Sequence, residues 1–378
     1  MRIAVIGAGP AGLLFAYLVK RRYPAWTIEV VEQNPADATF GFGVVFSQGA
    51  LGFLERDAPD LHAALAERME TWPMQRIVHR NEAIDIDGNG FSSIERLALN
   101  RFLQSLCGDS GVAMRFEHEV GDLDALAGAD LIVGADGLNS VVRKLQAERF
   151  QPQIEWLTNK FAWYGTTRAF DCLTLTFRES PDGVFVAHHY RYSPGMSTFI
   201  VECDRPTWDR AGFERLSDAE SRAYCERVFA KDLDGHPLVS NKSVWRNFPL
   251  LSNRHWSAGN RVLIGDALRT VHFSIGSGTR LAFEDAIALD RALGAAGADV
   301  AAALARFERE RRPVVEKIVD AANSSSFWYE RMAQAMQQPS WQLAYDYMTR
   351  SGRMDDTRLR EQAPNFMAWI DEKRGGSA

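Results

Sequence analysis

The sequence predicts an α/β fold with a parallel sheet, an antiparallel sheet inserted into it, and helices at the C-terminal end. Short apolar runs, typical of buried parallel strands, occur at four places: 2–6, 27–31, 131–133 and 262–264. Alternating segments between them indicate antiparallel strands, at 173–177, 184–188 and 197–203. The alanine-rich composition of 281–309 and the residues after it indicates helix.

The parallel-strand segments are widely separated along the chain, so the domain that they form is expected to be discontinuous. We expect this domain to comprise residues 1–75, 91–155 and 256–295. The inserted antiparallel-sheet domain is expected at 76–90 and 156–255. Residues 296–378 then form a C-terminal helical region.

The composition excludes several classes of protein. Acidic residues outnumber basic residues by 49 to 43, and this balance argues against a nucleic-acid-binding surface. The four cysteines form no CxxC pair, and no cluster of histidine, cysteine and carboxylate has the spacing of a metal site. No segment has the length and composition of a membrane span. We expect a cytoplasmic protein without metal, nucleic-acid or membrane partners, and the sequence leaves monomer and homodimer open.

A glycine-rich turn joins the first strand to the first helix. Residues 7–12 read GAGPAG, a GxGxxG pattern in which Gly7 permits the turn, Gly9 lets a pyrophosphate approach the backbone and Gly12 lets helix and strand pack closely. Glu32 follows the second strand, twenty residues after Gly12, where an acid accepts hydrogen bonds from ribose hydroxyls. This strand–helix–strand unit predicts a Rossmann-like dinucleotide site.

Two later segments indicate which dinucleotide is bound. Residues 134–143 (GADGLNSVVR) and 265–267 (GDA) resemble two flavin motifs of the FAD-dependent aromatic hydroxylases, the para-hydroxybenzoate hydroxylase-like family. All three motifs occur in the family's order, and the resemblance covers nearly the whole chain. It implies an FAD-binding domain of the GR2 type and a bound FAD. NADH or NADPH would visit transiently, and the sequence does not separate these two.

The resemblance implies a set of cofactor contacts. Asp266 would hold the ribityl chain, and backbone amides near Gly276 would reach the flavin pyrimidine ring. Arg96 matches a family arginine that contacts the flavin, although a solvated arginine at a helix start is a substantial alternative. The expected cofactor-binding residues are Gly7, Gly9, Pro10, Ala11, Gly12, Glu32, Gln33, Arg96, Asp136, Gly265, Asp266, Gly276, Ser277, Gly278 and Thr279.

The second flavin motif departs from the broad family pattern. Leu268 and Arg269 stand where Ala-His is usual, and Phe273 replaces a proline. Residues 272–279 are instead similar to a narrower branch that contains salicylyl-CoA 5-hydroxylase, 2-aminobenzoyl-CoA monooxygenase and protodeoxyviolaceinate monooxygenase. Three further stretches support this branch: 40–47, 163–166 and 197–203. Residues 229–238 look most like the aryl-CoA hydroxylases, whereas 163–166 and 245–248 look closer to the violacein enzyme.

The resemblance implies an NAD(P)H- and O₂-dependent hydroxylation of an electron-rich aromatic ring through a C4a-hydroperoxyflavin. An aryl-CoA thioester ranks first, with salicylyl-CoA converted to gentisyl-CoA. Hydroxylation of a free or tryptophan-derived indolic aromatic is the alternative. A flavoprotein oxidase or reductase that inserts no oxygen is a reading from a different class.

Candidate substrate and catalytic residues follow from this interpretation. His272 and Phe273 precede the flavin-cradling loop and are the catalytic candidates, although a histidine satisfied by backbone is nearly as good a reading of His272. Of the adjacent histidines at 188 and 189, only one can point to the pocket side of a strand. Arg191, Arg246 and Arg269 are candidate contacts for CoA phosphates. The expected substrate-binding residues are Tyr164, His188, Tyr190 and Arg246.

Overall fold

A computed structural model describes residues 1–39, 41–47, 49–122 and 126–375. Phe40, at the start of the branch-specific stretch 40–47, lies outside the described residues. The chain divides into two compact units. The first unit comprises residues 1–39, 97–155 and 249–320, and the second comprises 40–96, 156–248 and 321–378.

The described part of the first unit forms a six-stranded sheet with the order β16-β17-β9-β1-β2-β8. Its strands are β1 (Arg2–Ile6), β2 (Thr27–Val31), β8 (Ala113–Arg115), β9 (Leu131–Gly134), β16 (Ser257–Ala258) and β17 (Arg261–Leu263). All neighbours pair in parallel except β16 with β17. The predicted α/β fold is confirmed. Because parallel strands end at one edge, the segments after β1, β9 and β17 meet there.

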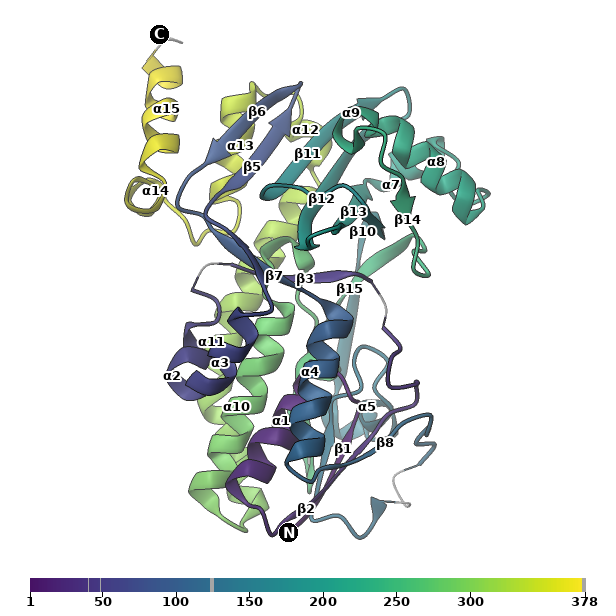
Figure 1. Ribbon diagram of the computed structural model, residues 1–378, viewed down its shortest axis with the longest axis vertical. Helices are drawn as coiled ribbons and strands as arrows, with labels where there is room; N and C mark the ends of the chain where they lie inside the picture. The colour runs from purple at the N-terminus through teal and green to yellow at the C-terminus, as the bar shows by residue number, and fades with distance from the viewer. Residues whose placement is uncertain (40, 48, 123–125, 376–378) are drawn as a thin grey trace. The chain divides into compact units, whose positions relative to one another are not determined.

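Helices cover this sheet. They are α1 (Pro10–Arg22), α4 (Arg96–Asp109, of which Arg96 belongs to the second unit), α5 (Val141–Leu145), α6 (Ala147–Phe150), α10 (Gly278–Ala296) and the greater part of α11 (Val300–Tyr329). Helix α1 begins with Pro10, whose fixed φ suits a first helical residue, and it packs along α10 (Figure 1). Arg22 ties the two helices together through Asp290, at 2.6 Å.

The described part of the second unit contains an eight-stranded sheet with the order β14-β10-β13-β12-β11-β5-β6, in which β15 also pairs with β10. The strands are β5 (Gln75–His79), β6 (Glu82–Ile86), β10 (Pro152–Thr166), β11 (Leu173–Ser180), β12 (Gly183–Ser193), β13 (Met196–Cys203), β14 (Leu238–Val239) and β15 (Arg246–Asn253). Residues 152–155 of β10 and 249–253 of β15 belong to the first unit. The predicted alternating segments are the antiparallel strands β11, β12 and β13. A small sheet of β3 (Gly43–Ser47), β7 (Phe91–Glu95) and β4 (Glu70–Trp72) accompanies them.

Two groups of helices pack on this unit's sheet, and each buries its own core. One core contains Phe185, Phe199 and Phe229 and is covered by α7 (Arg205–Arg210), α8 (Asp218–Val228) and α9 (Ala230–Leu233). The other contains Ile77, Leu175 and Phe366. It is covered by the end of α11 and by α12 (Met332–Ala335), α13 (Ser340–Thr349), α14 (Asp356–Gln362) and α15 (Pro364–Gly375). The short helices α2 (Gly52–Asp57) and α3 (Pro59–Ala66) complete the unit.

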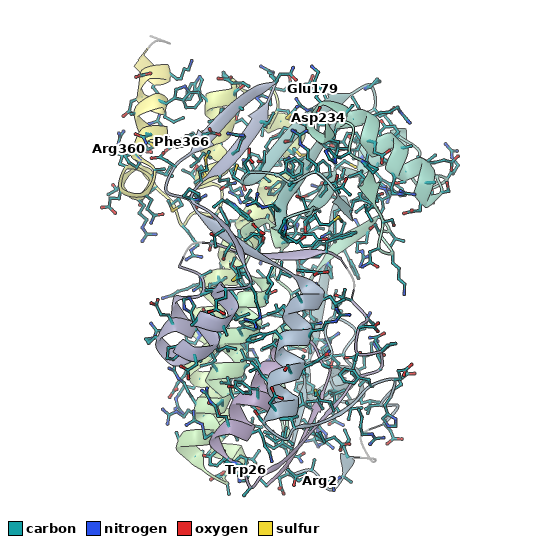
Figure 2. The ribbon with its side chains drawn as sticks, in the orientation of Figure 1. Arg2, Trp26, Glu179, Asp234, Arg360 and Phe366 are labelled. Carbon is teal, nitrogen blue, oxygen red and sulfur yellow. The ribbon has the colours of Figure 1, made fainter. Side chains whose placement is uncertain are left out.

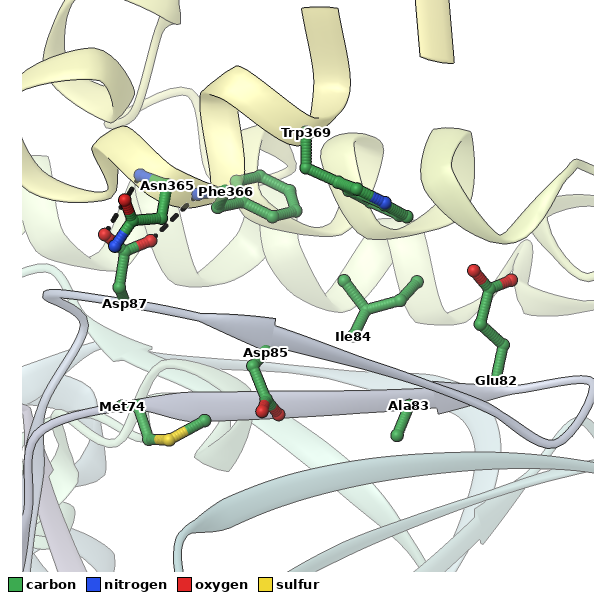
Figure 3. A pocket seen from close by; sticks show the side chains of 9 residues that line it. All are labelled: Met74, Glu82, Ala83, Ile84, Asp85, Asp87, Asn365, Phe366 and Trp369. Atoms are coloured by element: carbon green, nitrogen blue, oxygen red, sulfur yellow. Dashed lines mark hydrogen bonds between the residues drawn. The ribbon is translucent and has the colours of Figure 1, made fainter. Parts of the chain in front are cut away.

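The C-terminal helix α15 is fixed to the loop after β6. The Asp87 carboxylate accepts hydrogen bonds from the backbone N–H groups of Asn365 and Phe366 at 3.1 and 2.9 Å, as Figure 3 shows. A carboxylate at a helix N-terminus satisfies otherwise unpaired N–H groups. Gly88 permits this close approach, because its φ is +62° and a Cβ there would overlap the carbonyl oxygen of Gln362.

The two compact units differ from the expected domain boundaries, which stay a prediction. Residues 40–75, expected with the nucleotide-binding segments, belong to the second unit because β3 and β4 pair with β7. Residues 300–320 of α11 are grouped with the first unit and residues 321–378 with the second, so the division falls within α11. In the described ranges, no helix is long and apolar enough to cross a membrane.

Candidate functional site

The glycine turn after β1 is closely packed at two of its three glycines. Gly7 has a φ of +105°, and a Cβ there would lie 2.5 Å from the Ala135 carbonyl oxygen. A Cβ on Gly12 would overlap the carbonyl oxygen of Gly7. Gly9, in contrast, has open space where a Cβ would stand. The backbone at Gly9 is therefore accessible to a ligand, as a pyrophosphate site requires.

The N-terminus of α1 lies directly after this open glycine. Among the described residues, no side chain caps the helix and no acid lies in its first turn. The first N–H groups of a helix have no intrahelical partner, and they carry the positive end of the helix dipole. An anionic group next to Gly9 would satisfy these N–H groups.

Glu32 is fixed beside the same turn. One carboxylate oxygen accepts the Ala8 N–H at 2.9 Å, and the other accepts the backbone N–H and the side-chain amide of Asn34 at 2.9 and 2.7 Å. Each carboxylate oxygen can accept more than one hydrogen bond, so the group can also accept from a ribose. Gln33, next to it, is exposed.

The segment after β9 is the first flavin motif, and it is hydrogen-bonded to the second. The Asp136 carboxylate accepts the Val141 N–H at 2.7 Å, and burial raises the pKa of Asp136. Arg143 is buried, and its guanidinium donates to the Ala267 carbonyl at 2.8 Å and to the Leu138 carbonyl. Arg143 ends the GADGLNSVVR motif, and the motif alone did not predict a role for it. The structure shows that it joins this motif to the Gly265–Ala267 turn.

The second flavin motif is a single 3₁₀ turn, Gly265–Ala267, immediately after β17. Gly265 and Ala267 are buried, whereas Asp266 between them is exposed. Gly265 has a φ of +60°, and a Cβ there would lie 3.1 Å from the Cβ of Ala11 and 3.7 Å from that of Ala282. Ala11 is the second residue of α1 and Ala282 the fifth residue of α10, so the N-terminal parts of both helices pack against this turn, beside Asp266.

A buried ion cluster supports this turn. Asp285 is fully buried, and its two carboxylate oxygens accept from the guanidinium groups of Arg269 at 2.7 Å and Arg311 at 3.0 Å. Asp285 also accepts the Gly265 N–H at 3.0 Å, and Arg269 donates to the Gly265 carbonyl at 3.1 Å. Arg269, a candidate for CoA phosphates, is therefore a buried residue that fixes the flavin turn. Leu268, the other departure from the family pattern, is buried in the core.

The loop between that turn and α10 contains the catalytic candidates. His272 is 2% exposed, its Nδ1 accepts the Ser274 N–H at 3.3 Å, and its ring lies 4.2 Å from the Phe273 ring. Gly276 has a φ of +60° and ends the short 3₁₀ helix Phe273–Ile275. Within the described chain, no side chain caps α10, which begins at Gly278 after Ser277. Thr279 is the second residue of α10, so Gly276 to Thr279 form its N-terminus.

These features of the first unit fit FAD. The cofactor carries a pyrophosphate, ribose hydroxyls, a ribityl chain and a ring that becomes negatively charged on reduction. The first unit offers an open, uncapped helix start at α1, a fixed carboxylate at Glu32, an exposed Asp266 and a second uncapped helix start at α10. Each expected cofactor contact of this unit lies at one of these places or next to it, and their contacts with FAD stay predictions.

The predicted substrate residue Tyr164 lies in the core under α8. It is fully buried, its hydroxyl is 3.1 Å from the Ser221 Oγ, and burial raises the pKa of Tyr164. The same Ser221 Oγ accepts the indole N–H of Trp245 at 2.8 Å. Tyr164 therefore packs in this core, and its contact with the substrate stays a prediction.

The two adjacent histidines of β12 point to opposite faces, as expected for a strand. The His188 Nε2 lies 3.3 Å from the Glu202 carboxylate, which also accepts the side-chain amide of Asn159 at 2.8 Å. The His189 Nε2 lies 2.9 Å from the Thr176 Oγ1, and its ring stacks on Phe199. Burial holds the pKa of His189 well below its usual value.

The branch-specific stretches meet around β3. The Gly43 N–H donates to the Thr198 Oγ1 at 2.9 Å, and its carbonyl accepts the Tyr190 hydroxyl at 2.8 Å. A Cβ on Gly41 would lie 3.1 Å from the Trp163 ring. We call Gly41, Gly43, Trp163, Tyr190 and Thr198 the β3 cluster. Residues far apart in sequence thus form one group in the second unit.

The three remaining arginine candidates have different surroundings. The Arg96 backbone N–H donates to the Phe42 carbonyl at 2.8 Å, so Arg96 adjoins the β3 cluster. Arg191 pairs with Glu70 at 2.9 Å, which occupies its guanidinium. Arg246 is exposed, at the start of β15.

Comparisons with known proteins identify the family. A family model described as "FAD binding domain" matches residues 1–322. The chain is 42% identical to a salicyloyl-CoA 5-hydroxylase from Streptomyces sp, over 96% of this chain and 72% of the relative. It is 39% identical to the protodeoxyviolaceinate monooxygenase of Chromobacterium violaceum, over 93% of this chain and 94% of the relative. A 3-hydroxy-4-methyl-anthranilyl-[aryl-carrier protein] 5-monooxygenase from Streptosporangium sibiricum is 37% identical, over 94% and 95%.

Solved structures share the fold. PqsL of Pseudomonas aeruginosa, described as a probable FAD-dependent monooxygenase, aligns with a TM-score of 0.70 over 92% of this chain and 100% of that chain, at 21% identity. A 2-methyl-3-hydroxypyridine-5-carboxylic acid oxygenase aligns with a TM-score of 0.69 over 95% of each chain, at 18% identity. The protein uses FAD, with NAD(P)H as the reductant. The chain therefore belongs to the FAD-dependent aromatic hydroxylase family and is an FAD-dependent aromatic monooxygenase.

Proposed function

We propose that this monooxygenase hydroxylates an aryl-CoA thioester, converting salicylyl-CoA to gentisyl-CoA. The observation that carries the proposal is the 42% identity, over 96% of the chain, to an enzyme named salicyloyl-CoA 5-hydroxylase. The relative from Streptosporangium sibiricum is named for an aromatic ring attached to an aryl carrier protein. Two of the three most similar relatives reported above are thus named for aromatic acyl groups joined to large carriers.

In this proposal, the first unit holds the cofactor. The N-terminus of α1 binds the pyrophosphate, Glu32 accepts from the ribose and Asp266 accepts from the ribityl chain. The backbone amides of 276–279 stabilise negative charge on the reduced ring. FAD, when bound, supplies the chemistry that takes electrons from NAD(P)H and activates O₂.

The protein's own residues orient the ring and control protons. The His272 Nδ1 accepts the Ser274 N–H, so a neutral imidazole carries its proton on Nε2. We propose that this N–H donates to the phenolic oxygen of the substrate. Within the second unit, the β3 cluster offers the Trp163 ring and the Tyr190 side chain as surface for an aromatic group.

The test is NAD(P)H oxidation by the FAD-loaded enzyme, with mass spectrometry of the product. Salicylyl-CoA, 2-aminobenzoyl-CoA, free salicylate and tryptophan are compared, each with NADH and with NADPH. The proposal expects that salicylyl-CoA stimulates oxidation and gains one oxygen atom, whereas free salicylate does neither. Equal turnover of salicylate and its thioester would contradict it.

A free or tryptophan-derived indolic aromatic is the second candidate. It is favoured by the 39% identity to protodeoxyviolaceinate monooxygenase over 94% of that enzyme. Trp163, in a stretch that looks closer to the violacein enzyme, lies in the β3 cluster. Turnover of an indole, with both thioesters inert, would establish this candidate.

A further inference from the structure

A groove of about 590 Å³ lies in the second unit, away from the β3 cluster. It is formed by the β5–β6 turn, by β11 and by residues of α8 and α9. Figure 2 labels Glu179, which lines it. Four cationic residues line it as well, and we call it the basic groove: Arg80, Arg178, Arg227 and Lys231.

The cations of the basic groove are mostly uncompensated. Arg178 is held by two hydrogen bonds to the Asp232 carboxylate, at 2.8 and 2.6 Å. Arg80, Arg227 and Lys231 make no ion pair with any carboxylate in the described residues, and all three are exposed. The lining thus contains four cations and the carboxylate of Glu179, and Asp232 pairs with Arg178, in a chain whose net charge is −6. The groove is therefore positively charged although the chain as a whole is negative, and it favours an anionic ligand.

The turn between β5 and β6 organises the cations. Arg80 and Asn81 have φ values of +51° and +65°, as in a two-residue hairpin turn, and this conformation is uncommon for arginine. The Arg80 guanidinium donates to the Met336 carbonyl at 3.1 Å. The Asn81 Oδ1 accepts from Arg178 at 3.1 Å and from Lys231 at 3.4 Å. One amide oxygen therefore gathers two cations at one side of the groove.

The stretch that contains α9 is similar to the aryl-CoA hydroxylases and also contributes to the basic groove. Residues 229–238 look most like the aryl-CoA hydroxylases, yet no role in the flavin or ring sites accounts for that likeness. The structure places Ala230 and Lys231 of this stretch in the lining of the basic groove. Val228, which is half-buried, and Ala230, which is exposed, supply apolar surface beside the cations.

We propose that the basic groove binds the phosphorylated adenosine end of the CoA thioester, and this inference rests on the proposed function. The groove has the volume of a small-molecule site, and CoA combines several phosphate charges with an adenine that suits an apolar surface. The distance from the groove to the β3 cluster can be followed along β12. Phe177 of the groove lining pairs with Val186, and Tyr190 of the β3 cluster lies four residues further along the strand, a distance of about 13 Å. An extended pantetheine arm exceeds that length.

The neighbouring groove does not suit the same ligand. It has a volume of about 390 Å³ and lies between the β5–β6 hairpin and α15, as Figure 3 shows. Glu82, Asp85 and Asp87 line it together with Phe366 and Trp369. Three carboxylates would repel phosphates, so the charge of the lining distinguishes the two grooves.

The experiment compares two substrates in three variants of the FAD-loaded enzyme. Arg227→Glu and Lys231→Glu reverse charges in the groove, and Arg215→Glu reverses an exposed charge of the same unit outside its lining. The substrates are salicylyl-CoA and salicylyl-N-acetylcysteamine, a thioester without phosphates. We expect the ratio of kcat/KM values, CoA thioester over truncated thioester, to fall about tenfold in each groove variant, as for one lost charge-assisted contact. Arg215→Glu should keep the parent ratio.

Calorimetric titration of free CoA provides a readout that does not depend on turnover. CoA should bind the parent, and its Kd should rise about tenfold in both groove variants. If no thioester is hydroxylated, the proposed function fails, but a CoA affinity that depends on Arg227 and Lys231 would still support the groove. Equal ratios and equal CoA affinities in all variants would overturn the inference. The inference would also be overturned if the groove variants lost turnover only with a thioester of an aryl carrier protein, because the groove would then recognise a protein.

Discussion

Replacing Asp285 by asparagine would test how the buried ion cluster holds the flavin turn. Asp285 is fully buried and accepts from Arg269, Arg311 and the Gly265 N–H at 2.7 to 3.0 Å. The substitution keeps the shape but removes the charge, so two buried guanidinium groups lose their shared carboxylate. Removal of one partner from a buried ion pair costs about 3–5 kcal/mol. We expect a decrease of this size in the free energy of unfolding, measured by urea denaturation of the FAD-free protein.

FAD affinity should fall in the same variant. Asparagine has one acceptor oxygen where Asp285 has two, so it cannot accept from Arg311 on one side and from Arg269 and the Gly265 N–H on the other. The turn before Asp266 is then less fixed, and one lost hydrogen bond is worth about 1 kcal/mol. Fluorescence titration should therefore show a Kd for FAD that is several-fold higher.

Asp290→Asn on the same helix is the matched control. Its partner Arg22 is 43% exposed, so this pair should contribute no more than about 1 kcal/mol. Equal destabilisation by the two substitutions, or an unchanged FAD affinity in Asp285→Asn, would refute the reasoning.

Four further predictions concern single residues. Asp266→Ala should weaken FAD binding by about tenfold, the loss of one hydrogen-bonded carboxylate, and an unchanged flavin content after dialysis would remove that role. His272→Ala should raise the peroxide released per NAD(P)H oxidised, and parent-like coupling would exclude His272 from proton control. Tyr164→Phe should lower the free energy of unfolding by about 1 kcal/mol without changing the KM for the aromatic substrate, whereas a raised KM would return Tyr164 to the substrate site. His189 has a folded-state pKa below its unfolded value, so the unfolded state binds the proton first and stability is lost as pH falls below about 6.5. The loss approaches about 1.4 kcal/mol per pH unit for this one group, and His189→Asn should flatten the pH dependence of urea denaturation between pH 6.5 and 5.

The nucleotide-binding half of the fold was predictable because its signals are local. β1, α1 and β2 follow from an apolar run, a glycine pattern and a proline within a short stretch. Glu32 was predictable for the same reason, since its distance from the glycines fixes its place beside them.

The contacts that span long sequence distances were not predictable. Arg269, Asp285 and Arg311 form one buried cluster, but in the sequence Asp285 and Arg311 resemble charges on a solvated helix face, and Arg269 was a candidate phosphate contact. The burial of Tyr164 under α8 likewise depends on residues far away in the sequence, such as Ser221 and Trp245. The assignment of residues 40–75 depended on strand pairing between β3, β4 and β7, which leaves no local signature.

The attachment of α15 to the loop after β6 has a practical consequence for handling the protein. β6 ends the order of the eight-stranded sheet, so one of its backbone edges has no neighbouring strand in the described chain. Ile84 and Ile86 of this strand pack in the core that Phe366 and Ile370 of α15 complete. Proteolytic removal of the last two helices would leave an open strand edge next to a bared apolar face, which is the combination that drives fibrillar self-association. An affinity tag is therefore safer at a position that leaves α15 and its Asp87 cap intact.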